Sequence, residues 1–306
     1  MNKLFRKTEL ATALFSFLRK LLYVKYYICV ALFYRGKGGK QNHYNLPFMS
    51  GKLLRSWVLC CICMITFINV SSAQDDLTTF RNFQFSFNRV SQAWMKYNDT
   101  LSKTFETKGL AYPPYQIYLR SFKSNNEMEL WARNDDTPQY TLVKTYRVCA
   151  LSGILGPKRY EGDHQVPEGF YFIDDFNPKS DFYLSLLLNY PNYSDMVLGD
   201  RKKPGGDIYI HGGCVTIGCL PLTDVYIQEL YVLCLNAKLN GETYIPVHIF
   251  PTRFDRQGLN FLGRSYKDDI DKQKFWVNLK AGYDYFEKNH KLLPVMYDAE
   301  GKYVFQ

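Results

Sequence analysis

One thiol and one imidazole lie close together in the run from Asp207 to Leu220, where their types fit a nucleophile and its base. Cys219 supplies the thiol and His211 the imidazole. A free thiol has a pKa of about 8.5 and is only a few per cent ionised at neutral pH, so a neighbouring imidazole is the usual means of activating it. The pair therefore predicts nucleophilic acyl-transfer chemistry.

The residues before His211 predict how the imidazole is held. Ile208 and Ile210 alternate with polar residues, the period-2 pattern of a half-buried strand, so His211 should project from a strand end. Gly212 and Gly213 then allow a tight turn. An acceptor must fix the tautomer of the imidazole, and the Gly212 carbonyl is the nearest candidate.

The glycine before Cys219 predicts a second turn, which lets substrate approach the sulfur. At that turn the backbone N–H groups of Gly218 and Cys219 are expected to stabilise an oxyanion, an effect of roughly 3 to 4 kcal/mol per donor. Alone, a cysteine is more often a small buried hydrophobic residue than a catalyst. The catalytic interpretation depends on the whole arrangement of strand, His-Gly-Gly and Thr-x-Gly-Cys.

This arrangement resembles the signature of the L,D-transpeptidase catalytic domain (YkuD) family, His-Gly followed by Ser/Thr-x-Gly-Cys. It is most similar to the YafK-like branch, in which the His and the Cys lie close in sequence. Segments 151–159, 162–171 and 177–192 also look like family segments in family order, and the resemblance covers 115–253. Ile217 and Pro221 depart from the family pattern, so substrate contacts at those two positions are not carried over.

The resemblance implies a secreted cysteine acyltransferase or hydrolase that acts on peptidoglycan stem peptides. Cys219 would attack the carbonyl following the L-centre of a diamino acid and form a thioester, while His211 takes the thiol proton and returns it to the leaving amine. Gly212 and Gly218 complete the predicted catalytic set. An amine acceptor would give transpeptidation and water would give hydrolysis, and the sequence leaves both open. A wall-linked protein is an alternative substrate, and no cofactor is expected.

Substrate binding is assigned to Gly213, Thr216 and Arg253. Arg253 follows a predicted strand over 244–250 that could lie beside the Cys219 strand, which makes it a candidate for gripping a carboxylate. The competing interpretation is an ordinary surface arginine.

Two other function classes remain open. The first is a catalytically silent cell-wall-binding module with the same fold, which would not need a thiol beside an imidazole. The second is a generic thiol protease, for which no Asn or Asp that orients the imidazole can be identified.

The net charge of +9 is concentrated in the leader. Residues 1–73 hold 11 Lys and Arg and one acid, Glu9, which leaves 38 − 11 = 27 basic and 29 − 1 = 28 acidic residues after them. The remainder therefore has a net charge of −1, and nucleic-acid binding loses its main support.

The leader itself predicts export to the periplasm or cell envelope. Residues 49–73 have the form of a signal peptide, with a short basic region, an apolar core and small residues before a cleavage after Ala73. Cys60, Cys61 and Cys63 lie in that core without a lipobox. Residues 1–48 are interpreted as an over-extended N-terminus, with a basic membrane-surface segment as the alternative. Membrane contact is expected only through the leader.

The remaining pattern predicts a mainly β core, an L,D-transpeptidase-like β-sandwich, with added N- and C-terminal helices, α+β overall. An apolar stripe predicts one helix over 80–101 within an N-terminal segment 74–112. Predicted strands cover 116–122, 140–150, 169–173, 182–188, 208–211 and 244–250 in a catalytic domain 113–255. A helix over 223–235, capped by Thr223 or Asp224, would favour the thiolate of Cys219. Residues 256–306 form a helical extension whose stripe is Phe275, Leu279, Tyr283 and Phe286, with Gly282 a weak point.

The other cysteines and histidines receive mainly structural roles. Cys149 and Cys234 are expected to be buried thiols. Cys214 is left with three roles: it lines the site, replaces Cys219 as nucleophile, or forms a redox lock with it. His164, His248 and His290 lack partners at metal spacing, so no metal site is expected.

Overall fold

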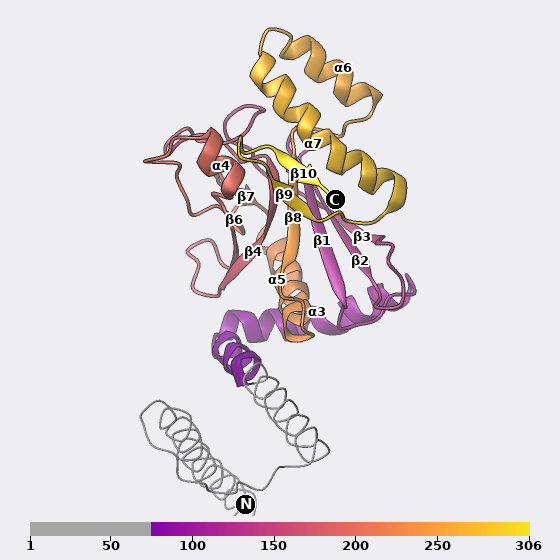
Figure 1. The fold of residues 1–306 in the computed structure, drawn as a ribbon. Helices are drawn as coiled ribbons and strands as arrows, with labels where there is room; N and C mark the ends of the chain where they lie inside the picture. Colours follow the sequence, from indigo (N-terminus) through magenta and orange to yellow (C-terminus); the bar gives the residue numbers. More distant parts are fainter. Residues whose placement is uncertain (1–74) are drawn as a thin grey trace, which may run out of the picture. The chain divides into compact units, whose positions relative to one another are not determined.

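Eight strands form one mixed sheet in the order β3-β2-β1-β8-β4-β5-β6-β7 (Figure 1). This computed structural model describes residues 75–306, and the leader predictions for 1–48 and 49–73 lie outside that range. The pairs β1–β8 and β6–β7 are parallel, and the other neighbours are antiparallel. The strands are β1 (Gln116–Phe122), β2 (Glu127–Arg133), β3 (Thr141–Arg147), β4 (Gly169–Asn177), β5 (Ser185–Leu188), β6 (Tyr209–His211), β7 (Leu220–Pro221) and β8 (Ile245–Phe250).

In the inner strand β1, side chains on both faces of the sheet are buried, because helices cover each face there. On β1, Ile117 and Leu119 belong to the apolar cluster that includes residues of α3 (Asn88–Glu106) and α5 (Asp224–Leu239). On the opposite face, Phe122 belongs to a second cluster with residues of α7 (Ile270–Asn289). This alternation follows from the period of two along a strand. The predicted α+β fold, with a β core and added helices at both ends, is confirmed.

The predicted N-terminal helix is interrupted. Residues 75–85 are helical, a bend follows, and α3 begins at Asn88. The Ser86 hydroxyl donates to the Phe83 carbonyl at 2.7 Å, a local bond that competes with helix continuation, and Phe87 is extended at the N-cap. Val90 and Leu101 of the predicted stripe are buried, whereas Phe83 is half exposed. The prediction of a single helix through this region is therefore wrong.

The helix predicted after Cys219 is present as α5. Its N-cap is Thr223, whose side chain accepts from Tyr226 N at 3.3 Å. The helix lies between the sheet and α3 (Figure 1). It is buried along most of its length, which ties the segment after the predicted nucleophile firmly to the core.

The C-terminal segment holds α6 (Arg256–Ser265), α7, and a two-stranded antiparallel sheet of β9 (Val295–Tyr297) and β10 (Tyr303–Phe305) that the sequence did not predict. All four residues of the predicted α7 stripe are buried. A Cβ on Gly282 would lie 2.7 Å from the Phe305 ring and 2.9 Å from the Phe170 ring. Gly282 therefore lets these two rings pack closely against α7. The sequence had indicated only that a glycine would weaken the helix.

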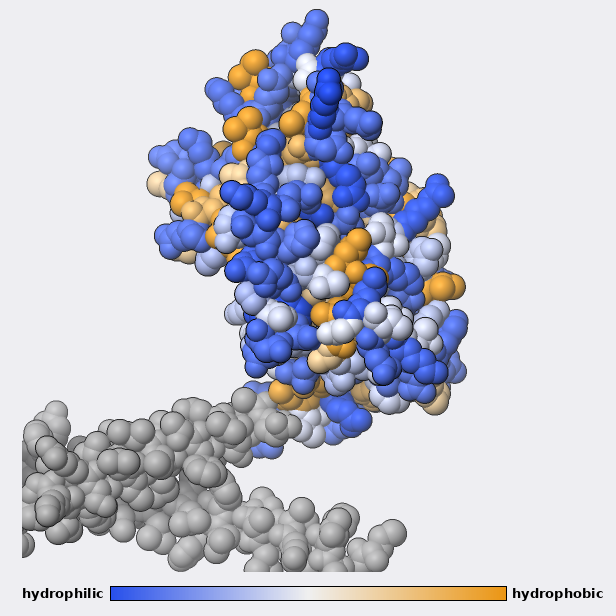
Figure 2. Space-filling view, turned by 90° about the vertical axis from the view of Figure 1, so that its right-hand side faces the viewer, coloured by the Kyte–Doolittle hydropathy of each residue, from blue (hydrophilic) through white to orange (hydrophobic). Residues whose placement is uncertain are grey.

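The face in Figure 2 is largely hydrophilic, with hydrophobic residues in small groups.

A short helix, α4 (Tyr193–Leu198), begins with a capping box between Asn192 and Asp195. None of the helices in residues 75–306 combines the length and apolarity needed to span a membrane.

Candidate active site

His211 and Cys219 lie on neighbouring stretches of backbone. In the parallel pairing of β6 with β7, Ile210 is opposite Leu220 and His211 is opposite Pro221. Both His211 and Cys219 line one cavity of about 540 Å³. The imidazole residue is only 2% exposed, whereas Cys219 is a free, partly exposed cysteine. The structure thus brings together the two residues that the sequence pairs as base and nucleophile.

The His211 ring is fixed by its neighbour, as expected. Nδ1 lies 2.6 Å from the Gly212 carbonyl oxygen. A carbonyl only accepts hydrogen bonds, so Nδ1 carries the proton and the neutral ring keeps its lone pair on Nε2. The Phe182 ring packs on the imidazole with 4.7 Å between centroids. This geometry leaves Nε2 as the nitrogen that can take a proton.

Both glycines of the turn after His211 are required by their surroundings. A Cβ on Gly212 would lie 2.5 Å from Asp224 Oδ1 and 2.8 Å from the Phe182 carbonyl. Gly213 has φ +85° and donates its N–H to Asp224 Oδ1 at 3.0 Å. Because that donor is taken, Gly213 does not offer its N–H to a substrate, and the binding role expected for it is not supported. Asp224 instead ties the turn to the start of α5.

The thiol of Cys219 makes two backbone contacts. Tyr209 N donates to Sγ at 3.5 Å, and Sγ donates to the Asp207 carbonyl at the same distance. Burial raises the pKa of Cys219, and the Asp207 charge raises it further, although the Tyr209 N–H and Lys158 act in the opposite direction. Burial therefore opposes the thiolate that the start of the following helix was expected to favour.

Burial also disfavours the charged form of the imidazole. It lowers the pKa of His211, with the Gly212 carbonyl partly opposing it. The resting pair is consequently a neutral thiol and a neutral imidazole. The thiol proton must therefore transfer during attack, after the S–H turns from the Asp207 carbonyl towards Nε2.

Alkylation by iodoacetamide tests this neutral resting pair. Because only the thiolate reacts and its pKa is raised from 9.0, Cys219 should react several-fold more slowly than free cysteine at about pH 7. Its rate should still be rising at about pH 9. The measurement is the adduct mass on the Cys219 peptide against pH, with Cys219→Ala as the blank. A rate that levels off below about pH 7 would indicate a pre-formed ion pair instead.

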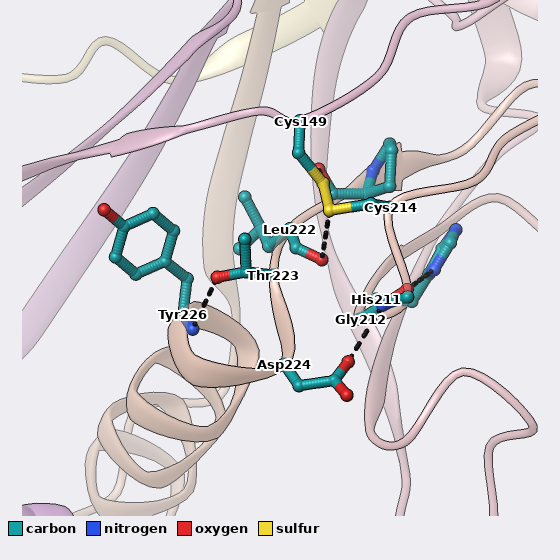
Figure 3. The surroundings of a disulfide bond; sticks show 10 residues. Cys149, His211, Gly212, Cys214, Leu222, Thr223, Asp224 and Tyr226 are labelled. Atoms are coloured by element: carbon teal, nitrogen blue, oxygen red, sulfur yellow. Dashed lines mark hydrogen bonds between the residues drawn. A yellow bond between two sulfur atoms is a disulfide. The ribbon is translucent and has the colours of Figure 1, made fainter.

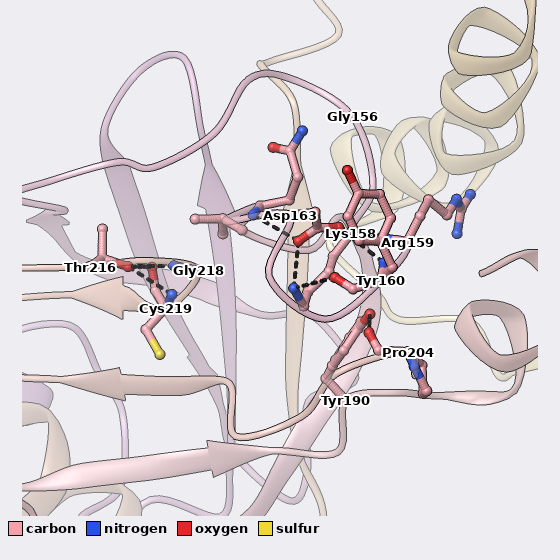
Figure 4. Close-up of polar contacts among 12 residues, drawn as sticks. Gly156, Lys158, Arg159, Tyr160, Asp163, Tyr190, Pro204, Thr216, Gly218 and Cys219 are labelled. Carbon is pink, nitrogen blue, oxygen red and sulfur yellow. Dashed lines mark hydrogen bonds and ion pairs between the residues drawn. The ribbon is translucent and has the colours of Figure 1, made fainter. Parts of the chain in front are cut away.

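Thr216 occupies the two N–H groups that were expected to bind an oxyanion (Figure 4). Its Oγ1 accepts from Gly218 N at 3.0 Å and from Cys219 N at 2.7 Å, and its hydroxyl donates to the Cys219 carbonyl at 2.9 Å. The expectation of two free donors is wrong for this state. An oxyanion could use them only by displacing the hydroxyl. Thr216, expected to bind substrate, therefore positions the Cys219 turn, in which Gly218 has φ +147°.

Replacing the hydroxyl tests this positioning role. Thr216→Val keeps the side-chain shape but leaves two N–H groups without their acceptor, at a cost of about 1 to 3 kcal/mol. If the turn shifts, kcat/KM should fall about 10- to 100-fold. Thr216→Ser retains the hydroxyl and should stay within about threefold of wild type. Equal kcat/KM values for the Val and Ser variants would refute the role of the hydroxyl.

A disulfide between Cys149 and Cys214 anchors the turn that follows His211 (Figure 3). Cys149 is therefore not the buried free thiol that was expected. Cys214 is neither the nucleophile nor a redox partner of Cys219. In residues 75–306 the free cysteines are Cys219 and Cys234, and Cys234 is buried as predicted. The disulfide thus leaves Cys219 as the reachable thiol of the described chain.

This disulfide should contribute measurably to stability. The linked residues are 65 apart, and loop-closure entropy for that length corresponds to about 4 kcal/mol. Denaturant unfolding of Cys149→Ser/Cys214→Ser should show a loss of that order, and reduction of the wild type should produce the same loss. Reductant should leave the double variant unchanged. A double variant as stable as the oxidised wild type would refute the prediction.

Arg253 does not reach the cavity. The strand before it, β8, lies between β1 and β4, and β4 and β5 separate β8 from β6. The Arg253 guanidinium pairs instead with Glu127 and Glu129, at 2.7 Å each. Its proposed grip on a substrate carboxylate is therefore wrong for this site, because its charge is already compensated elsewhere.

The loop before β4 supports the Cys219 turn from outside. Lys158 and Asp163 form a buried ion pair (Figure 4), and Asp163 also accepts from the backbone N–H groups of Arg159, Tyr160 and Gln165. A Cβ on Gly218 would lie 3.1 Å from the Gln165 carbonyl. The sequence marks this loop only as a family segment, and the Lys-x4-Asp spacing is the available sign of its internal ion pair.

No metal centre is evident in residues 75–306, where no three His, Cys, Asp or Glu side chains are grouped to hold an ion. His248 is instead buried with Nδ1 2.8 Å from the Tyr118 hydroxyl, and its pKa is lowered to about 3 by burial. It serves the core.

Comparison with known proteins gives a consistent picture. The family model described as "L,D-transpeptidase catalytic domain" (YkuD) matches residues 120–249. Two proteins called "Putative L,D-transpeptidase YafK", from Escherichia coli K12 and O157:H7, are each 33% identical over 206 residues, covering 67% of this chain and 78% of theirs.

Among solved structures, the helical cell shape determining protein Pgp2 from Campylobacter jejuni matches with 17% identity and a TM-score of 0.37, over 60% of this chain and 73% of that one. A mutant of the same protein matches with 21% identity and the same TM-score, over 46% of this chain and 49% of that one.

Proposed function

Since the chain belongs to the L,D-transpeptidase catalytic domain (YkuD) family, we propose that it is an exported cysteine acyltransferase or hydrolase acting on peptidoglycan stem peptides. The observation that carries the proposal is the shared cavity of Cys219 and His211. Its imidazole has Nδ1 held by a carbonyl, which leaves Nε2 to take a proton. No other free thiol in residues 75–306 is exposed.

The first chemical step forms a thioester. Cys219 Sγ attacks the carbonyl that follows the L-centre of the diamino acid, and His211 Nε2 takes the thiol proton as the C–S bond forms. The Gly212 carbonyl stabilises the imidazolium through Nδ1–H. When the C–N bond breaks, the imidazolium gives its proton to the leaving amine, so His211 returns to its neutral state.

The second step resolves the thioester. An amine acceptor loses a proton to His211 as it attacks the thioester carbonyl, the C–S bond breaks, and the Cys219 thiolate regains that proton from His211, which gives a new cross-link. Water in the same place gives hydrolysis. Both outcomes use the same two residues, so we propose them side by side, with a link between the wall and a protein as a further substrate of the hydrolytic reaction.

Export is supported by the disulfide. Cystine bridges persist in oxidising compartments and are rare in reducing ones, and Cys149 is bridged to Cys214. Together with the signal peptide predicted over 49–73, this favours the periplasm or cell envelope.

The alternative is a silent wall-binding module. Product analysis separates the two: the chain from Gln74 onward is incubated with peptidoglycan fragments, and the products are weighed by mass spectrometry. A released amino acid or a cross-linked product supports the enzyme, and its mass distinguishes hydrolysis from transpeptidation. Binding without any product would favour the module.

A further inference from the structure

Asp207 adopts an unusual backbone conformation at the edge of the active-site cavity. Its φ of +55° lies in the left-handed region, which few residues other than glycine enter and which Asp and Asn tolerate best. In this conformation its carbonyl accepts the Cys219 thiol at 3.5 Å. The residue also lines the cavity. One residue therefore supplies both the resting partner of the sulfur and a carboxylate in the substrate's space.

Within residues 75–306, the Asp207 carboxylate forms no ion pair. The charged residues that line the cavity are Lys179, Asp181 and Asp207, and none of the three is paired with another charge in that part of the chain. Asp207 is exposed to solvent, so its charge needs no protein partner and stays open to a cationic ligand. The cavity lining thus has an excess of one negative charge, which attracts a cation.

Of the two acidic residues that line the cavity, Asp207 is the one whose backbone carbonyl contacts the Cys219 thiol, at 3.5 Å. The Asp207 charge also raises the pKa of that thiol. A cation bound at Asp207 would therefore lie close to the carbonyl under attack. It would also offset the charge that opposes formation of the thiolate.

The acyl donor of the proposed function carries such a cation. The diamino acid whose carbonyl is attacked has a side-chain amino group, which is a free ammonium in an unlinked stem and a neutral amide in a cross-linked one. We propose that Asp207 binds this free ammonium and selects donor stems whose amino group is not yet cross-linked. The inference rests on the proposed function, because that function supplies the diamino acid.

A binding experiment tests this selection without turnover. Titration calorimetry would compare the inactive Cys219→Ala protein with Cys219→Ala/Asp207→Asn. The ligands are a stem tetrapeptide with a free side-chain amine and the same peptide N-acetylated at that amine. Acetylation should weaken binding at least about tenfold in the first protein and less than about threefold in the second. Asn also tolerates the left-handed conformation, so the loop should keep its shape.

The Cys219→Ala/Asp181→Asn protein is the matched control and should retain the tenfold effect. Acetylation that weakens binding equally with and without the Asp207→Asn change would overturn the proposal, as would transfer of the effect to Asp181. Failure of both peptides to bind would also overturn it. Because no product is formed in this assay, an inactive wild type in the product assay refutes the proposed function separately.

A second readout needs no peptide. In Asp207→Asn with Cys219 intact, loss of the neighbouring charge should move the iodoacetamide rate profile of Cys219 to lower pH. An unchanged profile would refute the electrostatic link between Asp207 and the sulfur.

Discussion

Cys219→Ala is expected to lower kcat/KM on peptidoglycan stem peptides by at least about a thousandfold, because it removes the atom that forms the thioester. The residual rate would come from substrate binding alone. The measurement is the initial rate of product formation, followed by mass spectrometry. Folding is checked by comparing denaturant unfolding of the variant with that of wild type, and the two should be similar because the side chain is partly exposed.

Cys234→Ala serves as the matched control. Cys234 is buried in α5, so its loss should reduce stability while the rate per folded molecule stays near that of wild type. A Cys219→Ala protein with near wild-type rates would contradict the nucleophile assignment.

His211→Gln is expected to lower kcat/KM by about 10² to 10⁴, because general base catalysis contributes that range. Glutamine preserves a polar side chain but cannot cycle a proton. His164→Asn is the control, since His164 is exposed with φ +55° and Asn tolerates that conformation. Comparable losses in the two variants would contradict a specific role for His211.

The pH profile of wild type gives the same assignment a second test. Activity from the neutral resting pair needs an unprotonated imidazole and a protonated thiol, so the acid limb follows His211 and the alkaline limb follows Cys219. The His211 pKa is lowered from 6.5 and the Cys219 pKa is raised from 9.0. The profile of kcat/KM should therefore be broad and flat across neutral pH. In His211→Gln the acid limb should disappear.

The turn that holds His211 could be predicted because its constraints are local. Alternation along β6 placed His211 at a strand end, and the next carbonyl in the chain proved to be the acceptor of Nδ1. The free donors expected at Gly218 and Cys219 failed for an equally local reason. The Thr216 hydroxyl folds back onto its own turn, and sequence does not tell whether such a side chain bonds backbone or ligand.

Long-range placement could not be predicted. Arg253 was assigned to the site because β8 could have been a neighbour of the Cys219 strand, but strand order depends on pairing between distant segments. Similarly, β2 was not predicted, because a charged residue such as Glu129 is typical of the surface and not of a buried strand. In the sheet Glu129 lies directly opposite Arg120 and pairs with it. The pairing of Cys149 with Cys214 is another contact between distant segments, one that spacing alone does not reveal.

The mass of the acyl-enzyme tests most directly whether Cys219 is the nucleophile. The chain is mixed with a stem tetrapeptide, quenched in acid within the first turnovers, digested and analysed by mass spectrometry. We expect an acyl adduct on the peptide that contains Cys219, removable by hydroxylamine as a thioester and absent from Cys219→Ala. Product formation with no adduct on Cys219, or with the adduct on another residue, would contradict this role of Cys219.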